Sequence, residues 1–65
     1  MPIINISIAK GRSLEQKRTL VQKVTQVVAE TIGVAPEKIW IRIDEFDTEN
    51  FAINGQLMSD KNAGS

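Results

Sequence analysis

The chain has 65 residues, and its eight basic and eight acidic residues cancel to a formal net charge of zero. This length limits it to one domain, and the neutral balance lacks the basic footprint of a nucleic-acid-binding protein. Cysteine and histidine are absent, which excludes a disulfide framework and the common zinc motifs. No long apolar run or signal-like start occurs, so we expect a cytoplasmic protein that does not enter a membrane.

Small size has a consequence for assembly. A domain of about 60 residues buries only ~60% of the surface that its unfolded chain exposes. Small scaffolds without disulfides or metals usually gain stability by oligomerisation. We therefore expect residues 1–65 to form a single domain that self-associates, with residues 59–65 as a flexible tail.

The first predicted element is a strand from Pro2 to Ala9, rich in β-branched isoleucine. Alternate residues share one side, which should face a covering helix: Pro2, Ile4, Ile6 and Ile8. The other side carries Ile3, Asn5 and Ser7.

Pro2 is also a candidate catalytic residue because it directly follows Met1. If Met1 is removed, Pro2 carries a terminal secondary amine. An α-amino group titrates near ~8, and an apolar pocket lowers that value by disfavouring the ammonium form. Such an amine suits general acid–base chemistry. Two alternatives stay open: Pro2 merely begins an edge strand, or Met1 is retained and Pro2 is a tertiary amide without a basic lone pair.

A long helix is predicted from Leu14 to Ile32. Ser13 and Gln16 form a capping-box pattern at its start, and Gly33 supplies a stop at its end. The apolar residues recur at helical spacing: Leu20, Val21, Val24, Val27, Val28 and Ile32. The basic residues near its start, Lys17, Arg18 and Lys23, are interpreted as a solvated face.

A second strand is predicted from about Lys38 to Phe46. Its apolar side carries Ile39, Ile41 and Ile43, and its other side carries Trp40, Arg42 and Asp44. Further on, Asn54-Gly55 predicts a tight hairpin between two short apolar segments, 51–53 and 56–58.

The predicted fold class is therefore α+β. A single β-α-β unit with parallel strands and a right-handed crossover precedes a short C-terminal hairpin. One helix covers only one face of the sheet, so other copies must cover the opposite face. Ligand sites often form where such surfaces meet.

Together, several of these features resemble the 4-oxalocrotonate tautomerase family, part of the tautomerase superfamily with an N-terminal proline. They are Pro2 at the strand start, the segment from Ile8 to Lys17, Phe51, and the Asn54-Gly55 hairpin. The resemblance spans about residues 2–58.

The resemblance implies an isomerase that interconverts enol and keto forms of a small 2-hydroxy-dienoate, as in the catabolism of aromatic compounds. Pro2 would act as general base and then as general acid, without metal or cofactor. Arg12 would bind a substrate carboxylate or keto oxygen, often from a neighbouring subunit, and Phe51 would supply an apolar wall. The expected assembly is a homohexamer, a trimer of dimers.

The chain departs from this family at one position. A second arginine of the best-studied members falls at Trp40 here. Trp40 is interpreted either as an anchor between subunits or as a wall that stacks on a planar dienol. Arg42 lies on the same strand side and either replaces the missing arginine or pairs with Asp44.

Two other functions are weighed against tautomerisation. A hydratase or dehalogenase needs a carboxylate to activate water, and relatives of that kind carry it two residues after the position of Phe51, where this chain has Ile53. A non-catalytic oligomeric homologue is the other alternative, and Trp40 in place of an arginine favours it.

Overall fold

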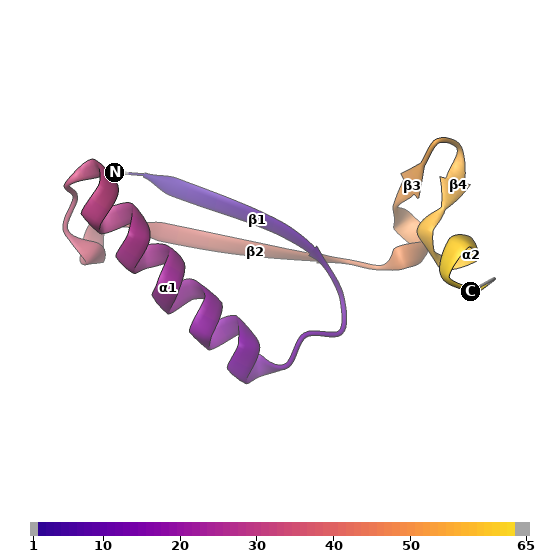
Figure 1. Ribbon diagram of the computed structural model, residues 1–65, viewed down its shortest axis with the longest axis horizontal. Helices are drawn as coiled ribbons and strands as arrows, with labels where there is room; N and C mark the ends of the chain where they lie inside the picture. The colour runs from indigo at the N-terminus through magenta and orange to yellow at the C-terminus, as the bar shows by residue number, and fades with distance from the viewer. Residues whose placement is uncertain (1, 64–65) are drawn as a thin grey trace.

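The computed structural model describes residues 2–63. The elements follow in the order β1 (Ile3–Ala9), α1 (Leu14–Ile32), η1 (Pro36–Lys38), β2 (Trp40–Phe46), η2 (Thr48–Asn50), β3 (Ala52–Ile53), β4 (Gln56–Leu57) and α2 (Met58–Ala63). Figure 1 shows α1 lying across one face of the two long strands, with the hairpin at the far end of the molecule.

The two long strands form a parallel pair, as the sequence predicts. Ile3 lies opposite Trp40 at one end of the pair, and Ala9 lies opposite Phe46 at the other. Burial alternates along most of both strands. Half-buried isoleucines occupy positions 4, 6, 41 and 43, and the residue between the two isoleucines of each strand is exposed. The predicted β-α-β unit is therefore confirmed.

The bounds of α1 agree with the sequence prediction at both ends. The Ser13 hydroxyl accepts a hydrogen bond from the Gln16 N–H at 3.1 Å, and the Gln16 side chain accepts one from the Ser13 N–H at 2.8 Å. This reciprocal pair is a complete capping box. At the other end Gly33 adopts a left-handed φ of 71° and donates its N–H to the Ala29 carbonyl. Glycine favours that conformation, so the helix stops there.

The second strand begins later than predicted. Residues 38 and 39 were expected in the strand, but β2 begins at Trp40 and Pro36–Lys38 form a 3-10 helix. Proline fits the first turn of a helix because its φ is fixed and its missing N–H is not needed there. The N–H of Ile39 then donates to the Pro36 carbonyl at 3.1 Å, which completes the turn before the strand.

The C-terminal segment contains both a confirmed prediction and a correction. β3 and β4 pair antiparallel around Asn54 and Gly55, whose φ angles are 54° and 80°. The tail predicted as flexible from residue 59 instead forms α2, which extends to Ala63; residues 64 and 65 lie outside the described residues. Asp60 in its first turn and Lys61 in its last turn complement the helix dipole.

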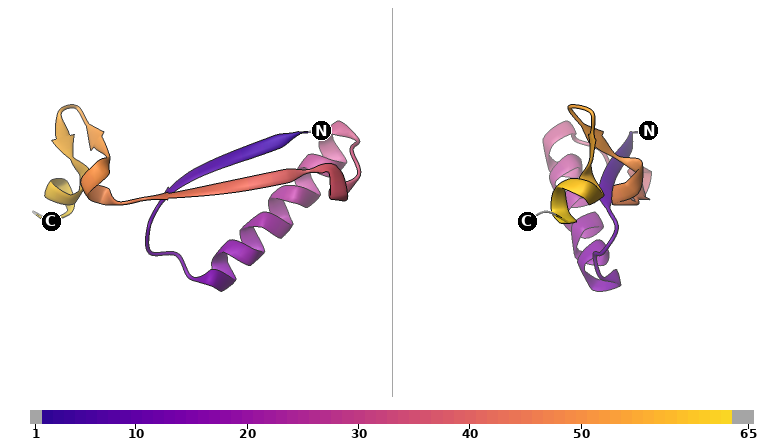
Figure 2. Two further views of the ribbon diagram at one scale, coloured as in Figure 1. Left: turned by 180° about the vertical axis from the view of Figure 1, so that it is seen from behind. Right: turned by 90° about the vertical axis from the view of Figure 1, so that its right-hand side faces the viewer.

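The chain has little core of its own. Among residues 2–61, whose side-chain burial is described, Ile39 is the one buried hydrophobic residue, at 8% exposure. A compact chain of this length has a radius of gyration of about 11 Å, whereas this chain has 15.3 Å and measures 45 × 24 × 15 Å. The view from behind shows the same elongated arrangement (Figure 2, left). The described residues therefore do not form a self-sufficient globule.

Part of the apolar stripe predicted for α1 is also uncovered. Leu20, Val21, Val24 and Val28 are half-buried, but Val27 is 59% and Ile32 is 55% exposed. A two-stranded sheet is too narrow to cover the whole stripe. Within residues 2–63, neither α-helix is long and apolar enough to cross a bilayer.

The capping box gives a testable consequence for stability. We predict that Ser13→Ala lowers the free energy of unfolding by about 1 kcal/mol, because the N–H of Gln16 loses its side-chain acceptor. Denaturant unfolding at a fixed protein concentration measures this loss, since self-association would otherwise shift the midpoint. Ser13→Thr keeps the hydroxyl and is the matched control. An equal loss in both variants would show that the hydroxyl bond is not what stabilises the helix start.

Candidate active site

Pro2 lies at the end of the sheet where β1 and β2 begin. It is half-buried, and its carbonyl oxygen accepts a hydrogen bond from the Trp40 N–H at 3.1 Å. Ile3 and Trp40 lie opposite each other on the adjoining strand positions and are 58% and 54% exposed. The residues that adjoin Pro2 at the strand start, Ile3 in sequence and Trp40 by the backbone hydrogen bond, thus present apolar side chains on the uncovered sheet face.

Arg42 lies two residues beyond Trp40 on the same strand side, as the sequence predicts. Its guanidinium forms an ion pair with Asp44, with 3.1 Å between Nη2 and Oδ1. Both side chains are largely solvent-exposed, at 73% and 48%. Arg42 therefore has a carboxylate partner in the same strand, and its positive charge is already compensated.

Arg12 lies beyond the opposite end of the sheet, in the turn between β1 and α1. It immediately precedes Ser13, the N-cap of α1. Its side chain lines a small hollow of about 210 Å³, together with Ile8, Gln16, Lys17 and Leu20. A guanidinium beside an apolar floor and a helix N-terminus is an arrangement that favours an anion.

Phe51 also lies beyond that end of the sheet, between η2 and β3. Its ring stacks on Phe46, the last residue of β2, with 4.9 Å between centroids and an angle of 21° between planes. Its carbonyl accepts a hydrogen bond from the Met58 N–H at 2.8 Å. The ring remains 40% exposed, so one part of it is available as an apolar wall.

The five candidate residues fall into two groups at opposite ends of the sheet. Pro2, Trp40 and Arg42 lie at or near the beginning of the strands, whereas Arg12 and Phe51 follow their ends. The seven residues of β1 advance roughly 20 Å between these ends. A single chain therefore does not bring the two groups together.

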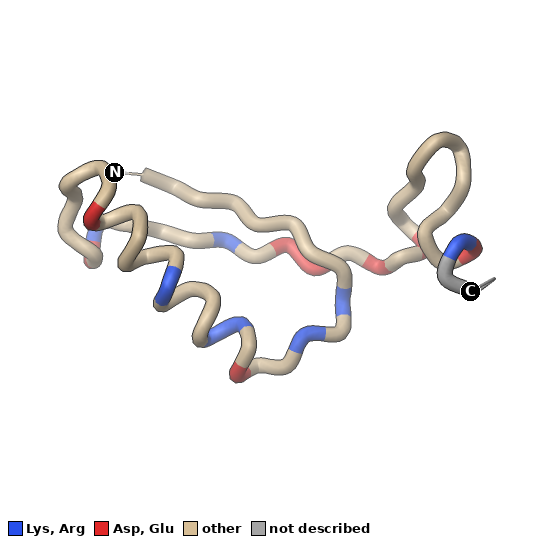
Figure 3. The backbone as a smooth tube through the Cα atoms, viewed as in Figure 1, with Lys and Arg blue, Asp and Glu red and all other residues tan. Residues whose placement is uncertain are grey.

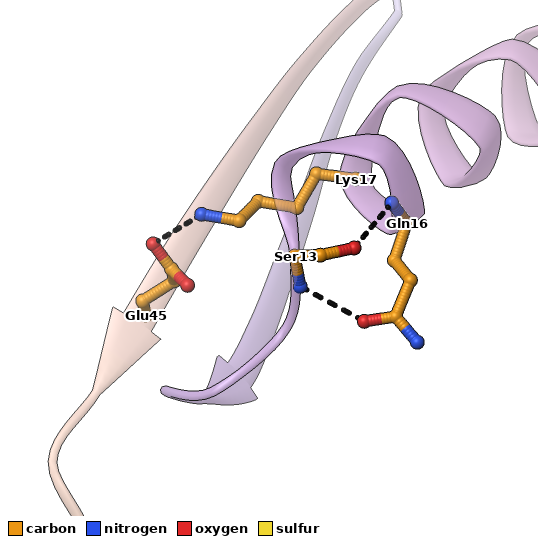
Figure 4. A network of polar contacts seen from close by, with 4 residues as sticks. All are labelled: Ser13, Gln16, Lys17 and Glu45. Atoms are coloured by element: carbon orange, nitrogen blue, oxygen red, sulfur yellow. Dashed lines mark hydrogen bonds and ion pairs between the residues drawn. The ribbon is translucent and has the colours of Figure 1, made fainter.

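The structure also shows polar residues that the sequence analysis does not assign to the site. Lys17 and Glu45 form an ion pair with 2.8 Å between Nζ and Oε1 (Figure 4). These residues are far apart in the sequence, and no local spacing pattern points to their contact. A wider hollow of about 490 Å³ lies along α1 and η1, but none of the candidate site residues lines it. Within residues 2–63, no group of three or more acidic side chains is placed to hold a metal ion.

Comparison with known proteins gives a consistent result. The family model described as "Tautomerase enzyme" matches residues 2–61. A 2-hydroxymuconate tautomerase from Bacillus subtilis is 43% identical over 60 residues, which cover 92% of this chain and 97% of the relative.

Solved structures share the fold. One is a 4-oxalocrotonate tautomerase isozyme from Methylibium petroleiphilum, with a TM-score of 0.95 and 36% identity, covering 98% of this chain and 100% of that one. Another is a heterohexamer 4-oxalocrotonate tautomerase from Chloroflexus aurantiacus, with a TM-score of 0.87 and 25% identity, covering 92% and 97%. The chain belongs to the tautomerase family of isomerases.

Proposed function

We propose that this protein is an enol–keto tautomerase that uses the terminal amine of Pro2 as its base. Removal of Met1 would expose a secondary amine at the start of β1. This amine takes a proton from the hydroxyl of an enol substrate and returns a proton to carbon, which yields the conjugated ketone. Atoms and charge balance within the substrate, and the proposed mechanism involves neither a metal nor a cofactor.

The observation that supports this proposal is the placement of Pro2. It precedes Ile3 and is bonded through its carbonyl to the N–H of Trp40, and both of these apolar residues are exposed. An apolar environment disfavours the ammonium form of an amine, which is what a neutral base requires. Positioned acid–base catalysis of this kind contributes about 10²–10⁴-fold in rate.

Arg12 and Phe51 complete the proposed site from a second copy of the chain. Their separation from Pro2 by the length of β1 favours a site shared between copies over a site within one chain. Copies that meet through their uncovered sheet faces, running in opposite directions, would place the Arg12 end of one beside the Pro2 end of the other. We propose a homohexamer made of three such dimers; the relative from Chloroflexus aurantiacus is a heterohexamer.

The substrate class follows from the charges at the two ends. Arg12 is proposed to bind one carboxylate or the keto oxygen, and Phe51 to exclude water from the reacting atoms. Trp40 offers a flat apolar surface beside Pro2, while the Arg42 charge is paired with Asp44. We therefore propose an enol acid with one carboxylate and a planar apolar remainder, such as phenylenolpyruvate, over a dicarboxylate such as 2-hydroxymuconate.

The alternative functions have less support from the residues at these positions. Ile53 lies in β3 and has no carboxylate to activate water, which disfavours a hydratase or dehalogenase. A non-catalytic homologue would need no basic amine at Pro2, and the intact mass separates the two cases. A species lighter by one methionine has the free amine that catalysis requires.

The central role of Pro2 is tested by substitution. We predict that Pro2→Ala lowers kcat by about 10²-fold or more, because the primary amine of alanine differs in basicity and is held less rigidly. Turnover of phenylenolpyruvate by protein whose mass confirms loss of Met1 measures the effect. Circular dichroism and oligomer size should match those of the wild type. An unchanged kcat would remove Pro2 from the mechanism.

The role of Trp40 in substrate choice has a separate test. We predict that Trp40→Arg raises kcat/KM for 2-hydroxymuconate relative to phenylenolpyruvate by about tenfold, because it adds a charge-assisted bond to the second carboxylate. Trp40→Leu is the matched control, since it removes the ring without adding charge. It should weaken turnover of the aryl substrate and give no gain on the dicarboxylate. If both variants change the two substrates equally, Trp40 serves the subunit interface and not the pocket.

A further inference from the structure

Charged residues of both signs gather around the turn between β1 and α1. Figure 3 shows basic positions along this turn and the start of α1, and acidic positions near the end of β2. The ion pairs in this region are Lys10–Asp47, Lys17–Glu45 and Arg18–Glu15. Within residues 2–63, Arg12 takes part in no ion pair. Its neighbours are therefore neutralised while its own charge is uncompensated.

The Lys17–Glu45 pair is the one that adjoins the Arg12 hollow. Lys17 lines this hollow together with Arg12 and Ile8, and Ile8 lies opposite Glu45 in the sheet register. The Glu45 carboxylate is thus on the strand position next to the hollow and is held there by Lys17. Two other ion pairs lie in this region, Lys10–Asp47 and Arg18–Glu15. Neither of them includes a residue that lines the hollow.

This pair is also better shielded from water than the other pairs. The Lys17 and Glu45 side chains are 26% and 31% exposed, compared with 64% and 49% for Lys10 and Asp47. Partial burial reduces screening, so the contact holds its geometry more firmly than a surface pair. The backbone of Lys17 is fixed as well, because its N–H donates to the Ser13 carbonyl at 3.1 Å in the capped first turn.

We propose that Lys17 is a positioning residue that keeps Glu45 away from Arg12 and so leaves the Arg12 guanidinium free for the substrate carboxylate. Without the lysine, the Glu45 carboxylate would be unpaired beside an unpaired guanidinium. The two would attract each other, and a substrate anion would have to displace Glu45 before binding. This inference rests on the proposed function, because it explains how the Arg12 guanidinium of the proposed site is kept available for the substrate.

The test is a double-variant cycle on the intact oligomer with phenylenolpyruvate as substrate. We expect Lys17→Gln to raise KM about fivefold, the size of one partly exposed ion pair, with kcat within twofold of the wild type. Lys17→Arg keeps the charge and should retain the wild-type KM. The decisive variant is Lys17→Gln combined with Glu45→Gln, which removes the competing carboxylate and should return KM to within twofold of the wild type.

Two results would overturn the proposal. If the double variant binds as weakly as Lys17→Gln, then Lys17 contacts the substrate itself or supports the fold, and Glu45 is not the competitor. If Lys17→Gln lowers kcat without changing KM, Lys17 does not control the binding of the carboxylate. If Lys17→Gln weakens the turnover of a neutral enol as much as that of phenylenolpyruvate, Lys17 again does not control the binding of the carboxylate. A neutral enol has no carboxylate for Arg12 to bind.

A binding measurement separates this inference from the proposed chemistry. Fumarate is a carboxylate that does not enolise, and the Ile8 methyl signals in NMR spectra should shift as it enters the hollow. Lys17→Gln should weaken this titration about fivefold, the double variant should restore it, and Arg12→Ala should abolish it. An inactive wild type that still shows this pattern would refute the tautomerase proposal and leave the Lys17 inference intact. An active wild type without this pattern would refute the Lys17 inference and leave the tautomerase proposal intact.

Discussion

The parallel register between β1 and β2 is the constraint on which the rest of the structure depends. It places the beginnings of both strands at one end of the sheet, so that Pro2 is hydrogen-bonded to Trp40. It also places the C-terminal ends of both strands together, so that the Arg12 turn and the Phe46–Phe51 stack lie at the same end of the sheet. A parallel pair needs a long crossover, and the single helix of this chain supplies it. The two ends of the sheet therefore differ in character: a basic turn lies at one end and an apolar strand start at the other.

The same constraint explains why so much apolar surface is uncovered. One helix covers one face of a two-stranded sheet, and Ile3 and Trp40 are left on the other face. The exposed side of α1 and the projecting hairpin add further apolar area, including Val27, Ile53 and Leu57. Large exposed apolar surfaces on soluble proteins mark sites of association. Association of copies would stabilise the chain and join its two ends into one site, so stability and catalysis would have a common origin in assembly.

Local signals in the sequence account for most of the fold. The capping box at Ser13 and the glycine at position 33 determine both ends of α1, and Asn54-Gly55 determines the hairpin, because each depends on residues close together in the chain. The start of β2 was misplaced because the turn-forming effect of Pro36 outweighed the alternating apolar pattern. The tail was misjudged because polar composition alone does not exclude a short helix.

The candidate site could be predicted only in part. Resemblance to a family pointed to Pro2, Arg12 and Phe51, but no periodicity indicates that they lie at opposite ends of a sheet. The sequence alone indicates a solvated Lys17, because its partner Glu45 lies on a distant strand and only the tertiary fold brings the two together. Contacts of this kind depend on register, which a single sequence does not display.

The claim that two copies share each site is tested most directly by mixing inactive subunits. Pro2→Ala and Arg12→Ala chains would be purified separately, unfolded together in equal amounts, and refolded into mixed oligomers. If Pro2 and Arg12 come from different copies, about a quarter of the sites regain both groups by random assembly, and activity rises well above the sum of the two parents. If each chain builds its own site, every site lacks one group. Activity that stays at that sum would contradict the account.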